Sequence, residues 1–319
     1  MVGSRFLFAI PGRVGAAVAQ PFQAHAGTGS TSGTIRIISA LRMVMEKRRM
    51  VPDEAMAMLD GALARLRQEA PLVHNITNQV VSNVTANALL AIGASPAMVQ
   101  AEEEVGEFVR HARALVINIG TLLAPQRAAM LIAARGAKAA GIPWVLDPVA
   151  AGATAYRRSA ARDLLSLGPS VLRGNAGEIL ALAGEAGLSR GVDSLAASTA
   201  AREAAGALAR QGKGMVVAVT GATDYVTDGT TMLALSNGHP LLTRVTGTGC
   251  TATALIGAFL GAGLPPMAAA VAGLTALGVA AEDAALRATG PGSFQVALLD
   301  RLHGLEDAAM REAARITPG

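Results

Sequence analysis

The sequence predicts an α/β protein with a mostly parallel central sheet and helices on both faces. From Pro52 onward, short apolar segments alternate with longer segments of helical periodicity, and this alternation favours parallel strands connected by helices. Hydrophobic residues make up 51% of the 319 residues, which provides a sizeable core, whereas aromatic residues make up only 3%. Alanine and glycine are common instead of aromatic residues, and helices packed on a sheet accommodate such small residues better than a β-sandwich does.

The expected strands are short, apolar and mostly followed by a polar residue or glycine. They cover residues 72–77, 114–119, 144–149, 171–173 and 215–220. Helices are expected near residues 53–68, 80–92, 124–139, 157–167, 178–182 and 195–210. Residues 225–227 and 231–236 flank Asp228-Gly229, a pair that favours tight turns, and they predict a hairpin added to the sheet. The pattern shows no internal repeat and no second domain.

Residues 1–50 predict a disordered basic extension in front of a single domain that covers residues 51–319. Residues 27–33 are rich in glycine, serine and threonine, a composition typical of disorder. Met43, Met45 and Met50 are each a plausible true start, so the extension can result from an early start assignment. A transit peptide is the functional alternative, because the segment bears arginines and is poor in acidic residues.

The charge of the chain argues against a nucleic-acid partner. The sequence pI of about 9.8 suggests a basic surface. However, residues 1–50 contain seven basic residues and one acidic residue, whereas the remainder contains 20 basic and 22 acidic residues. The expected domain is therefore slightly acidic, and a basic face for nucleic acid is not expected.

Residues 245–281 carry no charge, which raises the question of a membrane span. Gly261, Gly263 and Pro265-Pro266 divide this segment into two halves, each shorter than the roughly 20 apolar residues that a span requires. We therefore expect two buried helices and no membrane association. Cys250 is the single cysteine, so no internal disulfide can form, which is typical of a reducing compartment and favours a cytoplasmic location.

The most informative segment is Val245-Thr246-Gly247-Thr248-Gly249-Cys250-Thr251-Ala252, which precedes an apolar helical run. A glycine turn that opens a helix presents unpaired backbone N–H groups at the positive end of the helix dipole. Such a site binds phosphate, or stabilises the charge that develops on a phosphoryl group during its transfer. The segment therefore predicts the anion hole of a small-molecule kinase.

Two other interpretations fit this segment taken alone. One is a tight turn before a core helix, with Cys250 as a small buried apolar side chain. The other is the dinucleotide-binding pattern G-x-G-x-x-G/A, but that pattern requires an acidic residue about 20 positions further on. Residues 267–281 contain no acidic residue, and the Walker A pattern is absent from the chain.

Several expected strands are followed by polar residues that suit a ligand site. These residues are Asn75, Asn78, Asp147, Arg173, Asn175 and Thr220. In open parallel sheets, ligands bind beyond the carboxyl ends of the strands. The glycine turn should open above the same edge, and this convergence favours the anion hole over a plain core turn.

Together, the motifs of the chain resemble those of hydroxyethylthiazole kinases. The resemblance lies in HNITN at 74–78, TAN at 85–87, GASPAM at 93–98, NIGT at 118–121, LDPV at 146–149, RGNAGE at 173–178, VTG at 219–221, TGTGC at 246–250 and GPGSF at 290–294. They follow the family's order over about residues 55–303. Two positions depart from the family: Ala150 stands where glycine is usual, and Gly177 replaces another small residue.

The resemblance implies a ribokinase-like fold and an activity in thiamin salvage. The implied reaction is ATP-dependent phosphorylation of the hydroxyl of 4-methyl-5-(2-hydroxyethyl)thiazole. The resemblance also implies a homotrimer with active sites between subunits.

The resemblance further implies roles for individual residues. Mg²⁺ would be held by Asp147 and Glu178, and oxygen ligands of this kind suit that ion. ATP would be bound by Arg173, Thr220 and Asn175. The remaining roles are substrate binding by Met98, Asn78 and Gly247, and catalysis by Cys250, Gly249 and Thr248.

Some of these residues have structural alternatives. Asp147 could cap the turn before Pro148, Glu178 could favour the first turn of a helix, and Arg173 could form a surface salt bridge. Met98 could simply pack in the core. A helix N-terminus can lower the pKa of a thiol, so Cys250 could act as a weak base or could only position the hydroxyl.

Three other functions compete with thiazole phosphorylation. A hydroxymethylpyrimidine-type kinase of the same fold can also carry a glycine turn that ends in cysteine. A non-catalytic nucleotide-binding protein is a second alternative. A hydrolase with Cys250 as nucleophile is the third, and it would require a histidine partner such as His74 or His239.

Overall fold

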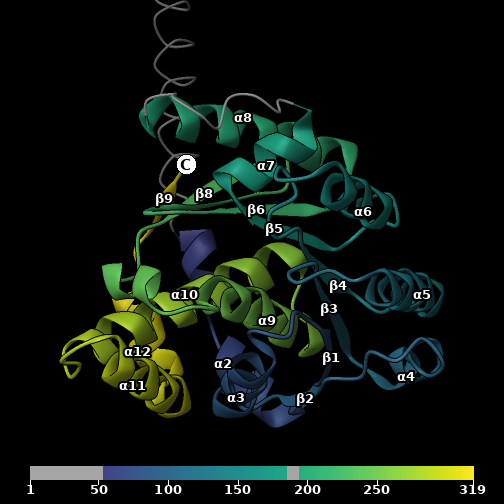
Figure 1. The fold of residues 1–319 in the computed structure, drawn as a ribbon. Coiled ribbons are helices and arrows are strands. Elements are labelled where there is room, and N and C mark those ends of the chain that lie inside the picture. Colours follow the sequence, from purple (N-terminus) through teal and green to yellow (C-terminus); the bar gives the residue numbers. More distant parts are fainter. Residues whose placement is uncertain (1–52, 185–193) are drawn as a thin grey trace, which may run out of the picture. The chain divides into compact units, whose positions relative to one another are not determined.

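The computed structural model describes residues 53–184 and 194–319. Within them, nine strands form one sheet in the order β2-β1-β3-β4-β5-β6-β7-β8-β9 (Figure 1). Neighbouring strands are parallel from β2 to β6 and antiparallel from β6 to β9. The predicted mostly parallel α/β sheet is therefore confirmed. The extension expected at residues 1–50 lies outside the described residues.

The parallel strands are those that the sequence predicts, with one addition at the edge. They are β2 (Ser95–Ala97), β1 (Leu72–Ile76), β3 (Ala114–Asn118), β4 (Trp144–Asp147), β5 (Val171–Asn175) and β6 (Val216–Thr220). The predicted hairpin is formed by β7 (Asp224–Thr227) and β8 (Met232–Leu235), and β9 (Ile316–Pro318) extends it. The sequence analysis missed β2 and β9, because a three-residue strand has no measurable periodicity.

Helices cover both faces of the sheet (Figure 1). One apolar core lies under α2 (Ala62–Glu69), α3 (Ser82–Ile92), α9 (Thr248–Gly261), α10 (Pro266–Ala285), α11 (Pro291–Gly304) and α12 (Asp307–Ala313). The other lies under α4 (Val105–Phe108), α5 (Ala124–Ala140), α6 (Ala155–Leu165), α7 (Ala176–Ala183) and α8 (Ser194–Gln211). Strand side chains alternate between the two cores, so Val116 faces the first while Leu115 and Ile117 face the second.

Two helical predictions differ from the structure. The single helix expected at 53–68 is interrupted, because residues 58–61 form turns and Gly61 adopts a left-handed conformation with φ of 65° before α2 begins. The helices α11 and α12 lie in a part of the chain for which no helix or strand was predicted.

The uncharged segment folds as the predicted pair of buried helices, α9 and α10. By length and composition alone, α10 is apolar enough to cross a membrane, but 83% of its most apolar window is buried inside the fold. It is therefore a core helix. The helix α9 crosses β3 closely, since a Cβ atom added at Gly257 would clash with Cγ2 of Val116.

This close crossing predicts that Gly257→Ala destabilises the protein. The added methyl group has no space, and overpacking a core costs roughly 1–3 kcal/mol of unfolding free energy. Urea unfolding of the variant measures the loss. The matched control is Gly292→Ala in α11, where an added Cβ meets no atom within 4 Å. Equal stability of the two variants would contradict the close crossing.

Candidate active site

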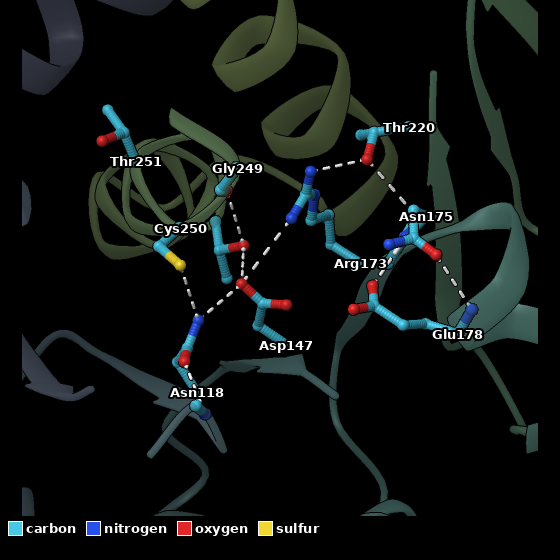
Figure 2. A network of polar contacts seen from close by, with 12 residues as sticks. Asn118, Asp147, Arg173, Asn175, Glu178, Thr220, Gly249, Cys250 and Thr251 are labelled. Carbon is cyan, nitrogen blue, oxygen red and sulfur yellow. Dashed lines mark hydrogen bonds and ion pairs between the residues drawn. The ribbon is translucent and has the colours of Figure 1, made fainter. Parts of the chain in front are cut away.

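The carboxyl ends of the parallel strands converge with the N-terminus of α9 (Figure 2). Asn118, Asp147 and Asn175 end β3, β4 and β5, and Thr220 ends β6. Asn118 and Asp147 form hydrogen bonds with the first turns of α9, and Arg173 packs against Gly249. The edge predicted from the sequence is therefore the place where these residues meet.

The glycine turn opens α9 as the sequence predicts. Gly247 is the residue before the helix and has φ of 86°, a left-handed conformation that favours glycine. A Cβ atom there would lie only 2.8 Å from Cγ1 of Val81. The first intrahelical bond runs from Thr251 N to Gly247 O (2.8 Å), so an α-helix of this kind leaves the N–H groups of the intervening residues without helical partners. These groups are the candidates for the anion hole that the sequence predicts.

Asp147 is fully buried at the end of β4 and is the most constrained group in the site. Its Oδ2 accepts hydrogen bonds from Asn118 Nδ2 (2.7 Å) and Thr253 Oγ1 (2.8 Å), and it lies 3.7 Å from Arg173 Nη1. Its Oδ1 is buried and has no hydrogen-bond partner within the described residues. Burial raises the pKa of Asp147 to about 6, although the charge of Arg173 opposes this shift. Such a carboxylate is suited to receive a cation.

Arg173 links Asp147 to the end of β6. Its Nη2 donates to Thr220 Oγ1 (2.5 Å), and only 11% of its side chain is exposed. A Cβ atom added at Gly249 would lie 2.9 Å from Nη1 of Arg173, so the guanidinium packs directly against the glycine turn. A planar fork of donors beside the anion hole is suited to a phosphate group. The surface salt bridge considered as an alternative does not describe this buried arginine.

Glu178 and Asn175 form a capping box at the start of α7. Asn175 Oδ1 accepts from Glu178 N (3.0 Å), and Glu178 Oε2 accepts from Asn175 N (2.8 Å). Glu178 Oε1 also accepts from Ala150 N (2.9 Å). The structural alternative for Glu178 is thus present in the fold. Each of its oxygens has a second lone pair, so the cap does not prevent the carboxylate from facing a metal ion.

The two carboxylates fit the requirements of Mg²⁺ bound with a nucleotide. The charge of Glu178 contributes to raising the pKa of Asp147, so the two groups are close enough to interact. Among the described residues, no cluster of three or more His, Cys, Asp or Glu side chains could hold a metal ion. Mg²⁺ commonly takes one or two carboxylates and completes its shell with water and phosphate. The buried, unpartnered Oδ1 of Asp147 fits such a role.

Cys250 is half-buried in the first turn of α9. Its Sγ lies 3.1 Å from Asn118 Nδ2 and 3.6 Å from Asn78 Nδ2. Burial, together with the charge of Asp147, raises the pKa of the thiol to about 11. This direction is opposite to the lowering expected from a helix N-terminus, and a thiol with such a pKa is protonated near neutral pH.

The described surroundings of Cys250 do not resemble those of a nucleophilic cysteine. Within the described residues, two asparagines, Asn78 and Asn118, donate hydrogen bonds to its sulfur. His74 instead bonds to Val99 O through Nε2 (2.8 Å), and Nδ1 of His239 accepts from Leu241 N (3.2 Å). The geometry therefore gives no support to the hydrolase alternative, which requires a histidine at the thiol.

Asn118 is the central residue that the sequence analysis left without a role. Its Nδ2 donates hydrogen bonds to both Asp147 and Cys250. Its Oδ1 accepts hydrogen bonds from Asn78 Nδ2 (2.9 Å) and Gly120 N (2.9 Å). The available signal was its position at the end of β3, on the same edge as the other polar residues. Thr253 was also missed, since a threonine one turn into an apolar helix is typical of core packing.

The other expected site residues lie in different surroundings. Asn78 belongs to the network through Asn118, and Thr248 Oγ1 donates to Leu242 O (2.8 Å). Met98 follows the edge strand β2 and is half-buried, and it takes no part in the polar network of Figure 2. Asn75 is buried, and its side-chain atoms have no hydrogen-bond partner within the described residues.

A cavity of about 620 Å³ begins at Arg173 and Gly249. Its polar end includes Thr220 and Thr248. Its apolar lining includes Leu242 and residues of α10, and the segment from Asn237 to His239 forms part of its wall. A polar end at an anion hole and an apolar body are the features expected of a nucleotide pocket.

A helix N-terminus beside a cavity of this size, at the carboxyl edge of a mostly parallel sheet, is the arrangement expected of a small-molecule kinase of the ribokinase-like class. The pyridoxal kinase from Staphylococcus aureus, determined in complex with ADP, has a similar fold. It matches 66% of this chain and 86% of its own with a TM-score of 0.53, and at 17% identity the likeness shows the fold alone. A family model for the hydroxyethylthiazole kinase family matches residues 63–308, so the chain belongs to that family.

Two relatives support the family assignment at high identity. Hydroxyethylthiazole kinase of Granulibacter bethesdensis is 62% identical over 253 residues, which cover 79% of this chain and 92% of the relative. The solved structure of the hydroxyethylthiazole kinase protein from Pyrococcus horikoshii is 48% identical and has a TM-score of 0.75. That match covers 81% of this chain and 97% of the solved chain.

Ala150, where the family usually has glycine, adopts a backbone conformation that glycine tolerates better. It has φ of 56°, in the left-handed region, where a non-glycine residue pays roughly 1–2 kcal/mol. We expect Ala150→Gly to relieve this strain and, after the entropy cost of glycine, to raise the unfolding free energy by about 0.5–1 kcal/mol. Urea unfolding measures the gain. Ala153→Gly in the same turn has no left-handed strain to relieve, so a gain there as large as that of Ala150→Gly would contradict the explanation.

Burial of the Asp147 carboxylate predicts that its charge, which the proposed site requires, lowers the free energy of unfolding. Its folded-state pKa of about 6 exceeds the ordinary value of 3.8, so its ionisation lowers the unfolding free energy as pH rises from about 4 to 6. Without nucleotide and metal, Asp147→Asn should therefore be more stable than the wild type at pH 8, by on the order of 1–3 kcal/mol, but not at pH 4. Thermal unfolding in EDTA at both pH values tests this. The control is Asp163→Asn at an exposed carboxylate, and a loss of stability in Asp147→Asn at pH 8 would refute the prediction.

Proposed function

We propose that the protein transfers the terminal phosphoryl group of ATP to the hydroxyl of 4-methyl-5-(2-hydroxyethyl)thiazole in thiamin salvage. The observation that carries the proposal is the position of the glycine turn. It lies between Cys250 on one side and the cavity with Arg173 on the other, so a hydroxyl and a triphosphate can meet at its N–H groups. Membership of the hydroxyethylthiazole kinase family supports this substrate.

In the proposed complex, ATP binds along Arg173, Thr220 and Asn175, with the nucleoside in the adjoining cavity. The guanidinium is already oriented by Thr220 and by Asp147, so little conformational entropy is lost when it meets a phosphate. The absence of a side chain at Gly249 leaves the guanidinium in this position.

We assign Mg²⁺ to the carboxylates of Asp147 and Glu178. The ion would neutralise the charge of the phosphate groups while they react. The protein's contribution is to hold Asp147 through Asn118 and Thr253 with one oxygen left unpartnered. The capping box fixes Glu178 in the same way.

The thiazole alcohol is assigned to the side of Cys250, with contacts from Asn78, Met98 and Gly247. Gly249 and Thr248 contribute backbone N–H groups to the transferred phosphoryl group. Phosphoryl transfer has a loose transition state and depends mainly on positioning and electrostatics, so a strong base is not required. Because its thiol is protonated at neutral pH, Cys250 is assigned to positioning the hydroxyl rather than to removing its proton.

The proposal also covers the assembly and the remainder of the chain. We propose a homotrimer whose active sites lie between subunits, in the cytoplasm, with small-molecule partners only. Residues 51–319 would form the catalytic domain, and residues 1–50 would be a dispensable extension.

A substrate panel tests the proposed function. Purified protein is incubated with ATP, Mg²⁺ and each of three alcohols: the thiazole alcohol, hydroxymethylpyrimidine and pyridoxal. Release of ADP is then followed with a coupled assay. We expect turnover with the thiazole alcohol only. Turnover with the pyrimidine alcohol alone would replace the proposal with the hydroxymethylpyrimidine kinase alternative. No turnover despite measurable nucleotide binding would favour the non-catalytic alternative.

Replacing Cys250 tests its assignment as a positioning residue. Cys250→Ala should keep measurable activity, with kcat reduced by about 10- to 100-fold, because the glycine turn and the carboxylates remain. Cys250→Ser restores a hydrogen-bonding group and should recover part of that loss. If both variants were inactive and mass spectrometry detected a covalent adduct on the wild-type thiol, a nucleophilic role would replace the one proposed.

A further inference from the structure

Three segments far apart in the sequence meet at the part of the cavity wall formed by Asn237 and Gly238. Asn237 and Gly238 follow β8 and line the cavity, Glu282 lies on α10, and Arg315 immediately precedes the C-terminal strand β9. Strand β9 pairs antiparallel with β8 (Figure 1). The pairing continues to Arg315, whose carbonyl accepts a hydrogen bond from Ser236 N (3.0 Å), next to Asn237. We call Asn237, Glu282 and Arg315 the C-terminal latch.

Glu282 connects the latch to the cavity wall. Its Oε1 accepts a hydrogen bond of 2.6 Å from Gly238 N, and its two oxygens lie 3.4 and 3.5 Å from Asn237 Nδ2. A backbone N–H that loses its acceptor inside a protein costs roughly 1–3 kcal/mol. Without Glu282, Gly238 N loses this acceptor, and we expect the wall to shift to a conformation in which the N–H group finds another partner.

The C-terminal segment completes the latch. Arg315 N donates to Asn237 Oδ1 (2.7 Å), and Asn237 Nδ2 donates to Ala313 O (2.8 Å). The guanidinium of Arg315 forms an ion pair with Glu282 and donates to Ser236 O (3.0 Å). Both the amide of Asn237 and the carboxylate of Glu282 are thus held by the last residues of the chain.

Exposure indicates which of these contacts matters most. The Arg315 side chain is 53% exposed, so its ion pair with Glu282 is screened by solvent and contributes little. The Glu282 side chain is only 26% exposed, and its bond to Gly238 N is charge-assisted. Loss of the carboxylate should therefore move the wall more than loss of the guanidinium.

We propose that the C-terminal latch positions the cavity wall from Asn237 to His239 for the nucleotide, so that the last residues of the chain set the affinity for ATP. The proposal rests on the proposed function, because it takes this cavity as the nucleotide site. The latch residues are positioning residues: Glu282 and Arg315 do not line the cavity, and they act through Asn237 and Gly238.

The test compares Glu282→Ala, Glu282→Gln and Arg315→Ala with the wild type. Steady-state kinetics give kcat and the KM values for ATP and for the thiazole alcohol, and calorimetry gives the Kd of ADP. For Glu282→Ala we expect the KM for ATP and the Kd of ADP to rise about tenfold, which corresponds to about 1.4 kcal/mol. For Arg315→Ala we expect a rise of about threefold. Both kcat and the KM for the alcohol should stay within twofold.

Glu282→Gln separates the hydrogen bond from the ion pair. Its amide oxygen can still accept from Gly238 N, so nucleotide affinity should stay within twofold of the wild type. The control for a general loss of stability is Arg311→Ala. That change breaks the exposed ion pair between Arg311 on α12 and Asp60, in the turn before α2. Neither residue lines the cavity, so every constant should stay unchanged.

Three results would overturn the proposal. The first is an unchanged KM for ATP and Kd of ADP in Glu282→Ala, even if its melting temperature falls. The second is a loss of affinity in Glu282→Gln equal to that in Glu282→Ala. If Glu282→Ala does not fold, unchanged affinity in Arg315→Ala is the third. Wild-type protein that neither turns over ATP nor binds ADP would instead refute the proposed function.

Discussion

The site depends on keeping the carboxylate of Asp147 inside the protein. A buried charge is costly unless it is paired and hydrogen-bonded, and here Asn118, Thr253 and Arg173 share that task. Each of them comes from a different element, so β3, α9 and β5 are fixed relative to β4 by one group. The same partners then orient their other atoms: Asn118 reaches Cys250, and Arg173 reaches Thr220. The polar network therefore holds these four elements together and is also the candidate catalytic centre.

The helix α9 serves the fold and the site with different parts of its length. Its C-terminal part packs on β3 through the space left by Gly257, which anchors the helix deep in one core. Its N-terminal turn then projects past the ends of the strands, where Gly247 and Gly249 leave room for Val81 and Arg173. Because the anchored part is tightly packed, the backbone N–H groups of the first turn are held in place before any ligand arrives.

Much of this arrangement could be predicted from the sequence, and what could not has physical reasons. Parallel strands such as β3 and β6 are buried on both faces, so they stand out as apolar runs, and the polar residues that follow them mark the edge. The strands β2 and β9 are too short to show a pattern. Asn118 gave little signal because its importance lies in its partners, which are 29 and 132 positions away. The raised pKa of Cys250 likewise depends on burial that no local motif reveals.

The state of Cys250 has a chemical consequence beyond phosphoryl transfer. Oxidants and alkylating agents attack the thiolate form of cysteine rather than the thiol. With a pKa of about 11, the sulfur of Cys250 carries a negative charge in only about one molecule in ten thousand at pH 7. Since this is the single cysteine of the chain, the raised pKa leaves the protein with little thiolate for peroxide or electrophiles to attack, and the twelve methionines are its other oxidisable sulfur atoms. The burial that raises the pKa of Cys250 therefore also protects this thiol from oxidation and alkylation.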